Sequence, residues 1–187
     1  MTRACRVLGI ALAVAAMVAV LAGPRDAGAR RPSETKYEDV ERILKHKPDA
    51  TPRDLAAAGA DIDSVLTDMV STRKLNPELR LRAVRALGGY PGSRARAVLT
   101  TLTTTPDEAT EVRVVAMETL AKTFGQSVLS DVKPYVKDPD PALRSGAALA
   151  LGAIGGREAR GLLECALEHE EVLEVRLIID EALARAR

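Results

Sequence analysis

Aromatic residues, cysteines and histidines are scarce in this chain of 187 residues. Three tyrosines, one phenylalanine and no tryptophan leave few of the stacking platforms on which single-stranded nucleic acids bind. The two histidines, His46 and His169, are too far apart in sequence for zinc or haem spacing. Of the two cysteines, Cys5 lies in the N-terminal segment that is predicted below to be cleaved off. Cys165 would then be the single cysteine, so an internal disulfide is not expected. Cys165 stands between apolar neighbours and is predicted to be a small core residue.

An excess of charge of one sign is also lacking. The 27 basic and 26 acidic residues nearly cancel, and no Lys/Arg cluster indicates a nucleic-acid surface. No Ser-His-Asp order, Gly-x-Ser-x-Gly motif or phosphate loop occurs. The sequence therefore predicts no nucleic-acid partner, no catalytic residue, no metal and no cofactor, and a protein that is not an enzyme.

The first 29 residues have the layout of a secretory signal peptide. A basic start, Met1–Arg6, precedes an uncharged run, Val7–Gly23, and a small-residue cleavage motif, Ala27–Ala29. Cleavage after Ala29 would export the protein to the periplasm or the extracellular space and leave no stable membrane span. The alternative is an uncleaved anchor, because the run approaches the ~20 apolar residues that a transmembrane helix needs.

What the chain does contain is an internal repeat. Two residue types recur every 31–33 residues: Gly59, Gly92, Gly125 and Gly156, and Arg80, Arg113, Arg144 and Arg176. A period in the low thirties predicts stacked repeats, each too small to bury its own apolar face. We call the four arginines the arginine ladder.

Each repeat has the pattern of two helices. Apolar residues stand one place before each ladder arginine and three and seven places after it, on one helical face. The glycine that follows is predicted to end this first helix in the left-handed conformation. A second apolar stripe then predicts a second helix, in which Pro134 should cause a kink. Gly146, inside a first helix, should permit close contact with the next helix. No strand pattern occurs.

The segment from Asp138 to Gly152 resembles the first helix of a HEAT repeat, in the short variant best known from phycobilisome lyases. Gly155 to Leu167 resembles its second helix. The resemblance covers roughly residues 51–187 and implies an α-solenoid and, usually, a protein-binding role. We therefore predict an all-α chain in three parts: a signal peptide (1–29), an N-terminal cap helix with its linker (30–50), and a solenoid of about four HEAT-like helix pairs (51–187).

Two sets of side chains are candidates for function. The arginine ladder is predicted to be structural, through pairs with acidic residues at neighbouring helix starts; the alternative is a row that binds an anionic ligand. These predicted carboxylates are Glu78, Glu111, Asp140 and Glu174. The resemblance also implies that second helices line a concave partner-binding face. That face would present Arg94, Arg96, Thr100, Thr103, Ser130, Asp131, Lys133, Arg160, Glu164 and Glu168.

The function predicted first is a non-catalytic protein-binding or scaffold module of the cell envelope or secreted space, with another protein as partner. One alternative, suggested by the resemblance, is an enzyme or chromophore-lyase-like protein. Another is a self-associating structural protein in which the last helix stacks on a second copy. The polar residues of that helix favour a cap instead, which indicates a monomer or weak self-association: Glu174, Asp180, Glu181 and Arg185.

Overall fold

The computed structural model describes residues 34–186, which belong to a single structural unit. Every regular element in this part of the chain is a helix. In chain order the elements are α1 (Glu34–His46), α2 (Pro52–Leu55), the 3₁₀ helix η1 (Ala56–Ala58), α3 (Ile62–Ser71), α4 (Pro77–Leu87), α5 (Ser93–Thr104), α6 (Thr110–Phe124), the 3₁₀ helix η2 (Gly125–Val128), α7 (Leu129–Val132), the 3₁₀ helix η3 (Lys133–Lys137), α8 (Pro141–Ile154), α9 (Gly156–His169) and α10 (Leu173–Arg185). The predicted signal peptide lies outside the described residues.

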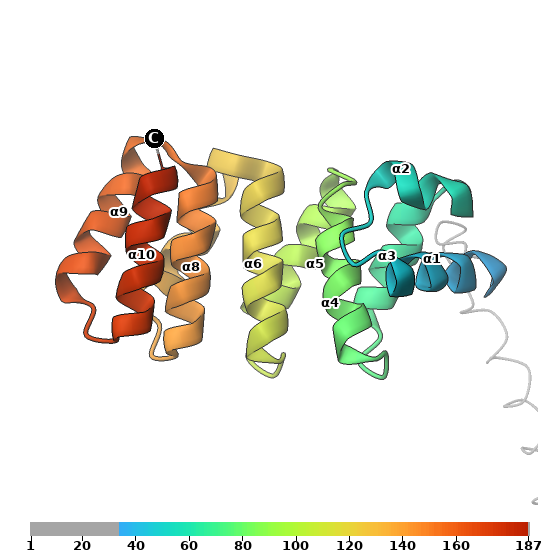
Figure 1. Cartoon of the computed structure of the whole chain (residues 1–187), viewed down its shortest axis with the longest axis horizontal. Coiled ribbons are helices and arrows are strands. Elements are labelled where there is room, and N and C mark those ends of the chain that lie inside the picture. The colour runs from blue at the N-terminus through green and yellow to red at the C-terminus, as the bar shows by residue number, and fades with distance from the viewer. Residues whose placement is uncertain (1–33, 187) are drawn as a thin grey trace, which may run out of the picture. The chain divides into compact units, whose positions relative to one another are not determined.

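The helices of the repeats stack in two layers. The first helices α4, α6 and α8 stand side by side, with α3 and α5 behind them, and α10 packs against α8 and α9 (Figure 1). Helix α1 crosses the N-terminal repeat, where it contacts α3 and α4. The prediction of an all-α solenoid is confirmed.

Helix starts in the repeats follow local capping chemistry. Thr51 and Asp54 form a reciprocal capping box at α2. The side chains of Asn76 and Asp140 accept backbone N–H bonds at the starts of α4 and α8, and proline follows each of them. These caps satisfy donors that a helix N-terminus leaves unpaired, and they fix where each first helix begins.

The predicted apolar face of the first helices is the seam of the solenoid. The residues that precede the ladder arginines (Leu79, Val112, Leu143 and Val175) are at most 5% exposed. Two glycines let neighbouring first helices approach closely. A Cβ at Gly146 would lie 3.0 Å from the side chain of Val114 on α6, and one at Gly152 would lie 3.0 Å from the Cα of Ala182 on α10. The close contact expected at Gly146 is therefore with the preceding first helix.

Two local predictions have different outcomes. Gly125 ends α6 with a positive φ of 54°, but Gly92 has an extended φ of −172° and starts α5 instead of ending α4. The left-handed prediction is wrong at Gly92 because α4 already stops at Leu87 and a turn follows. Pro134 lies in the segment η2–α7–η3, where the second helix of its repeat is broken into three short pieces. A proline lacks the backbone donor that a continuous α-helix needs there.

Candidate functional site

Three of the four ladder arginines close the C-terminal ends of the preceding second helices. Arg80 donates from Nε to the carbonyl of Val70 in the last turn of α3, at 2.7 Å. Arg113 reaches the carbonyl of Thr103 in α5 at 3.1 Å, and Arg176 reaches that of Leu167 in α9 at 2.9 Å. The last carbonyls of a helix have no partner within the helix, so each of these three guanidinium groups satisfies one of them and joins its first helix to the second helix of the preceding repeat.

Two ladder arginines also grip a carboxylate from the next repeat. Arg80 binds both oxygens of Glu108 at 2.7 Å, and the two side chains are 8% and 7% exposed. Arg144 binds both oxygens of Glu170 at 2.7 and 2.9 Å, with its Nη1 on the carbonyl of Asp138. Such planar two-point contacts are among the strongest hydrogen-bonded ion pairs. They fasten one repeat to the next.

The electrostatics agree with this geometry. Hydrogen bonds from Arg144 lower the pKa of Glu170 to about 2, helped by the backbone N–H of Val172 and opposed by burial. The pKa of Glu108 is also lowered, chiefly by its hydrogen bonds to Arg80. The pKa of Arg144 is raised by its bonds to Glu170. Both carboxylates are therefore held in their charged form.

Arg113 differs, because an aromatic ring takes the place of the carboxylate. Its guanidinium lies over the ring of Tyr135 at 5.7 Å. The Tyr135 hydroxyl donates to the carbonyl of Thr103, which also accepts the Nε–H of Arg113. The carbonyl at the end of α5 is thus satisfied by Arg113 together with an uncharged side chain, that of Tyr135.

The predicted partners of the ladder are wrong. None of the four carboxylates at neighbouring helix starts (Glu78, Glu111, Asp140 and Glu174) has a direct ion pair with a ladder arginine in the described part of the chain. The true partners, Glu108 and Glu170, lie in the turns that lead into α6 and α10. The side chain of Asp140 caps α8 instead, and Glu78 pairs with Arg82. The row is engaged in structural contacts, which favours its structural interpretation over an open anion site.

The predicted partner-binding face is only partly available. Thr103 is 1% exposed and donates to the carbonyl of Leu99, so its assignment to an exposed face is wrong: it points between helices. Arg94 bonds Asp63 of α3, and Arg96 bonds the carbonyl of Ser127. The other predicted residues are exposed or half-buried on the second helices: Thr100, Ser130, Asp131, Lys133, Arg160, Glu164 and Glu168. Arg94 and Arg96 thus join neighbouring second helices.

A groove of about 770 Å³ opens between η3, the start of α8 and α9. Apolar and charged side chains line it in equal numbers, together with one histidine: Lys133, Pro134, Val136, Lys137, Asp138, Arg144, Leu162, Cys165, Ala166, His169, Glu170, Glu171 and Val172. Only Lys133 belongs to the face predicted from the sequence. The groove lies where the interrupted second helix meets α9, so Pro134 is the residue from which it could have been anticipated.

Cys165 lies in this groove, and the prediction that it is a buried core residue is wrong. Its side chain is exposed and makes no disulfide. Leu162 and Ala166, which flank it on α9, are half-buried, whereas Leu163 is fully buried. The broken helix η2–α7–η3 leaves this side of α9 uncovered, because its pieces are too short to form a continuous partner.

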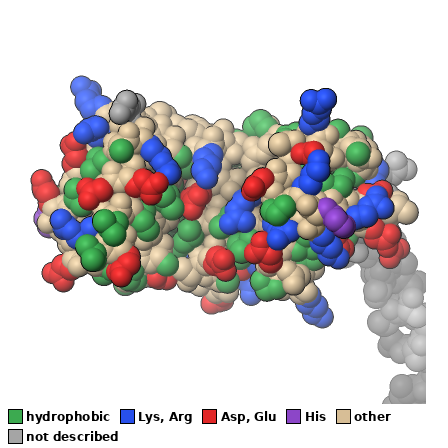
Figure 2. All heavy atoms as spheres, in the orientation of Figure 1, with side chains coloured by type: hydrophobic (Ala, Val, Ile, Leu, Met, Phe, Trp, Pro, Cys, Tyr) green, Lys and Arg blue, Asp and Glu red, His purple; other side chains and the backbone are tan. Residues whose placement is uncertain are grey.

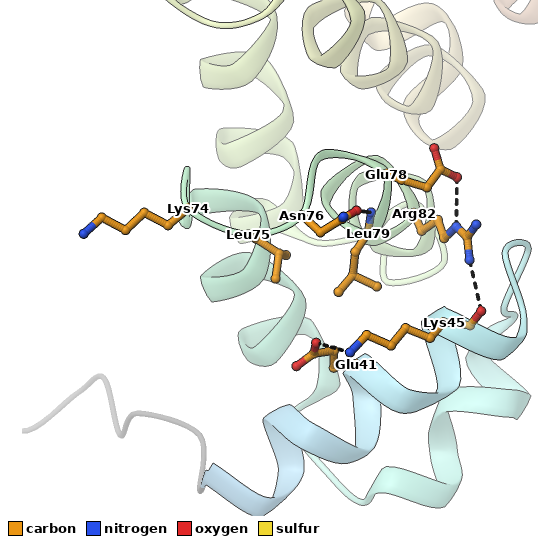
Figure 3. Close-up of a pocket in the computed structure, with 8 residues that line it drawn as sticks. All are labelled: Glu41, Lys45, Lys74, Leu75, Asn76, Glu78, Leu79 and Arg82. Atoms are coloured by element: carbon orange, nitrogen blue, oxygen red, sulfur yellow. Dashed lines mark hydrogen bonds and ion pairs between the residues drawn. The ribbon is translucent and has the colours of Figure 1, made fainter.

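A second hollow, of about 450 Å³, lies between α1 and the turn that precedes α4 (Figure 3). Four of its five charged side chains form ion pairs: Lys45 bonds Glu41 at 2.6 Å, and Arg82 bonds Glu78 at 2.9 Å. Arg82 also donates to the carbonyl of Leu44 at the end of α1 at 3.0 Å. This hollow therefore marks the joint that holds the cap helix on the first repeat.

Residues 34–186 contain neither a membrane-spanning helix nor a cluster of metal ligands. No helix in this range is long and apolar enough to cross a bilayer. No group of three or more histidine, cysteine, aspartate or glutamate side chains in it could hold a metal ion.

Comparison with known proteins agrees with the geometry. Residues 106–184 match the family model described as HEAT repeats, a segment that runs from just before α6 into α10. No curated protein matches the chain. This segment is therefore similar to HEAT repeats, and the two-layered helix stack is the α-solenoid expected of such repeats.

Proposed function

We propose that this protein is a non-catalytic protein-binding module that holds a segment of a partner protein in the groove between η3 and α9. The observation that carries the proposal is the groove itself, in which apolar side chains lie beside charged ones. Such concave sites are where ligands usually bind. HEAT repeats commonly mediate protein interactions, which supports a binding role over catalysis.

The base of the groove is rigid. Arg144 and Glu170 are bonded to each other at two points and to backbone groups on both sides. They therefore hold the shape of the groove and leave recognition to its walls. Pro134 and Val136 form one wall, and Leu162 on α9 belongs to the other. An aliphatic side chain of the partner would be removed from water between them.

Charges at the rim suggest the chemistry and direction of the partner. Lys133 and Lys137 are exposed, and neither has an ion-pair partner within residues 34–186. Glu171 is exposed beyond the apolar stretch. An extended segment with an aliphatic anchor, an acidic residue toward the two lysines and a basic or neutral residue toward Glu171 fits this arrangement.

Site-specific cross-linking at Cys165 tests this function. In a Cys5→Ser chain, a photoreactive maleimide on Cys165 should capture a partner from an envelope extract. The same label on a Thr101→Cys, Cys165→Ser chain, at an exposed position on α5, should not. Ala166→Glu, which places a charge in the groove, should reduce the capture about tenfold while the thermal midpoint stays near that of the parent. Equal capture at both positions, or capture unaffected by Ala166→Glu, would contradict the proposal.

The place of action is part of the proposal and depends on the N-terminal sequence. The basic start, apolar run and Ala27–Ala29 motif support export to the periplasm or the extracellular space. N-terminal sequencing of the protein recovered from a fractionated culture should find Arg30 as the first residue. A first residue upstream of the apolar run would instead indicate a retained anchor.

A further inference from the structure

Helix α10 carries an outward face that no described helix covers. Leu173 and Leu177, one turn apart, are 64% and 60% exposed, and no other large hydrophobic side chain within residues 34–186 is as exposed. On the opposite side, Val175, Ile179 and Ala182 are at most 2% exposed against the core. We define the α10 outer face as Leu173, Glu174, Leu177, Asp180, Glu181 and Ala184. Figure 2 shows acidic and hydrophobic side chains interspersed where α10 faces the viewer in Figure 1.

The repeat register shows what such a face normally contacts. Leu177 follows its ladder arginine by one place, as Leu81 and Val114 follow theirs. Leu81 is 3% exposed, and Val114 packs on α8 at Gly146. In the repeats of α4 and α6 this position therefore packs within the helix stack, and in the repeat of α8 it is the half-buried Ser145. Leu177 at this position of α10 could therefore pack against a further helix.

One position breaks the register. Four places after the ladder arginine, the earlier repeats have Val84, Met117 and Ala148, each at most 3% exposed. The fourth repeat has Asp180, which is exposed. A wholly apolar helix would bury this carboxylate without a partner, which is unfavourable. A helix that covers the α10 outer face must therefore carry a polar or basic side chain opposite Asp180, unlike a further first helix that is apolar at this position.

We propose that the α10 outer face binds an amphipathic helix of a partner protein that presents aliphatic side chains to Leu173 and Leu177 and lysine or arginine to Asp180. Glu174 and Glu181 flank the two leucines and add negative charge, of which Arg185 offsets part through its 2.6 Å bond to Glu181. A basic helix meets both requirements of the face, aliphatic contact and opposite charge. A second copy of α10 would bring three carboxylates against the same three, so the charge selects against self-pairing.

A designed peptide tests this proposal independently of the groove, because no residue of the α10 outer face lines the groove. The probe is a synthetic helical peptide with a stripe of leucines and with lysines directly beside this stripe, and its binding is measured by fluorescence anisotropy at physiological salt. Leu177→Ser and Asp180→Lys should each weaken binding about tenfold. Glu168→Lys, an equal charge change on the neighbouring helix α9, should change it less than about twofold. A peptide with glutamates in place of the lysines should not bind.

Three outcomes would overturn the proposal. Equal losses from Asp180→Lys and Glu168→Lys would mean that the peptide senses only the general charge of the surface. No loss from Leu177→Ser would mean that the leucines are not contacts. A dimer that sedimentation detects in the parent protein, and that Leu177→Ser dissociates, would identify a second copy as the occupant. Circular dichroism of each variant checks that the solenoid is folded, as expected for substitutions of exposed side chains.

Discussion

Replacing Glu170 with alanine removes the carboxylate that holds the Arg144 guanidinium between α8 and α10. Removing one partner of a buried ion pair costs about 3–5 kcal/mol, because the other charge is left without its counterion. Arg144 is 17% exposed and keeps two backbone carbonyl acceptors. We therefore expect a loss at or below the lower limit of this range, about 2–3 kcal/mol of unfolding free energy, in urea titrations at pH 7.

Two matched variants separate the components of this loss. Glu170→Gln keeps an oxygen that can accept the Val172 N–H but removes the charge, so it should cost less than Glu170→Ala. Glu164→Ala removes the partner of Arg160 in an exposed pair and should cost at most about 1 kcal/mol. If Glu170→Ala costs no more than Glu164→Ala, the ion pair does not hold the repeats together and our interpretation of the ladder is refuted.

The pH dependence provides a second readout of the same pair. The pKa of Glu170 is lowered in the folded protein to about 2 from an ordinary value of 4.5. A lowered acid pKa stabilises the fold above the ordinary value, and this stabilisation is lost as the pH falls from about 4.5 toward 2. The parent should therefore lose urea stability over this window more steeply than Glu170→Gln. Parallel curves for the two proteins would contradict the assignment.

Two further predictions test packing. Leu163→Ala should cost about 2–5 kcal/mol because the side chain is fully buried, whereas Glu168→Ala should cost almost nothing; similar melting losses would contradict the face assignment of α9. Gly152→Ala should destabilise the protein by about 1–3 kcal/mol, since the added Cβ would meet the backbone of Ala182. Gly92→Ser should be neutral or stabilising, because Gly92 is an N-cap residue with extended backbone and open space around it. Calorimetry of both glycine variants measures the difference, and a stabilising Gly152→Ala would show that α8 and α10 are less closely packed.

The repeat period predicted the solenoid because each helix pair repeats its apolar spacing, and burial selects the same positions every time. Leu79, Leu143 and Leu163 are buried as predicted for this reason. The ladder contacts were harder to predict, because Glu108 and Glu170 lie in turns 28 and 26 residues beyond their arginines. A helical pattern indicates which side of a helix faces the core, but it does not determine the path of a turn.

The groove was not predicted, for a related reason. The sequence pattern treated the segment after Gly125 as one helix with a kink, whereas it forms three short pieces. The loss of a continuous neighbour changes the exposure of residues on another helix, as at Cys165. Thr103 shows the opposite effect: its hydroxyl bonds within its own helix, so a residue of polar type is buried at little cost.

Because the ladder arginines differ in their partners, we expect the middle of the solenoid to resist unfolding by acid better than its two ends. Glu108 and Glu170 fasten the outer junctions, whereas the central one relies on the ring of Tyr135 and on the contact of Val114 with Gly146. Protonation of the two glutamates would loosen α1–α5 from one side and α10 from the other, while α6 and α8 stay joined. Hydrogen exchange at about pH 2, where Glu170 begins to be protonated in the folded protein, would then show slow amides in the middle and fraying toward both ends.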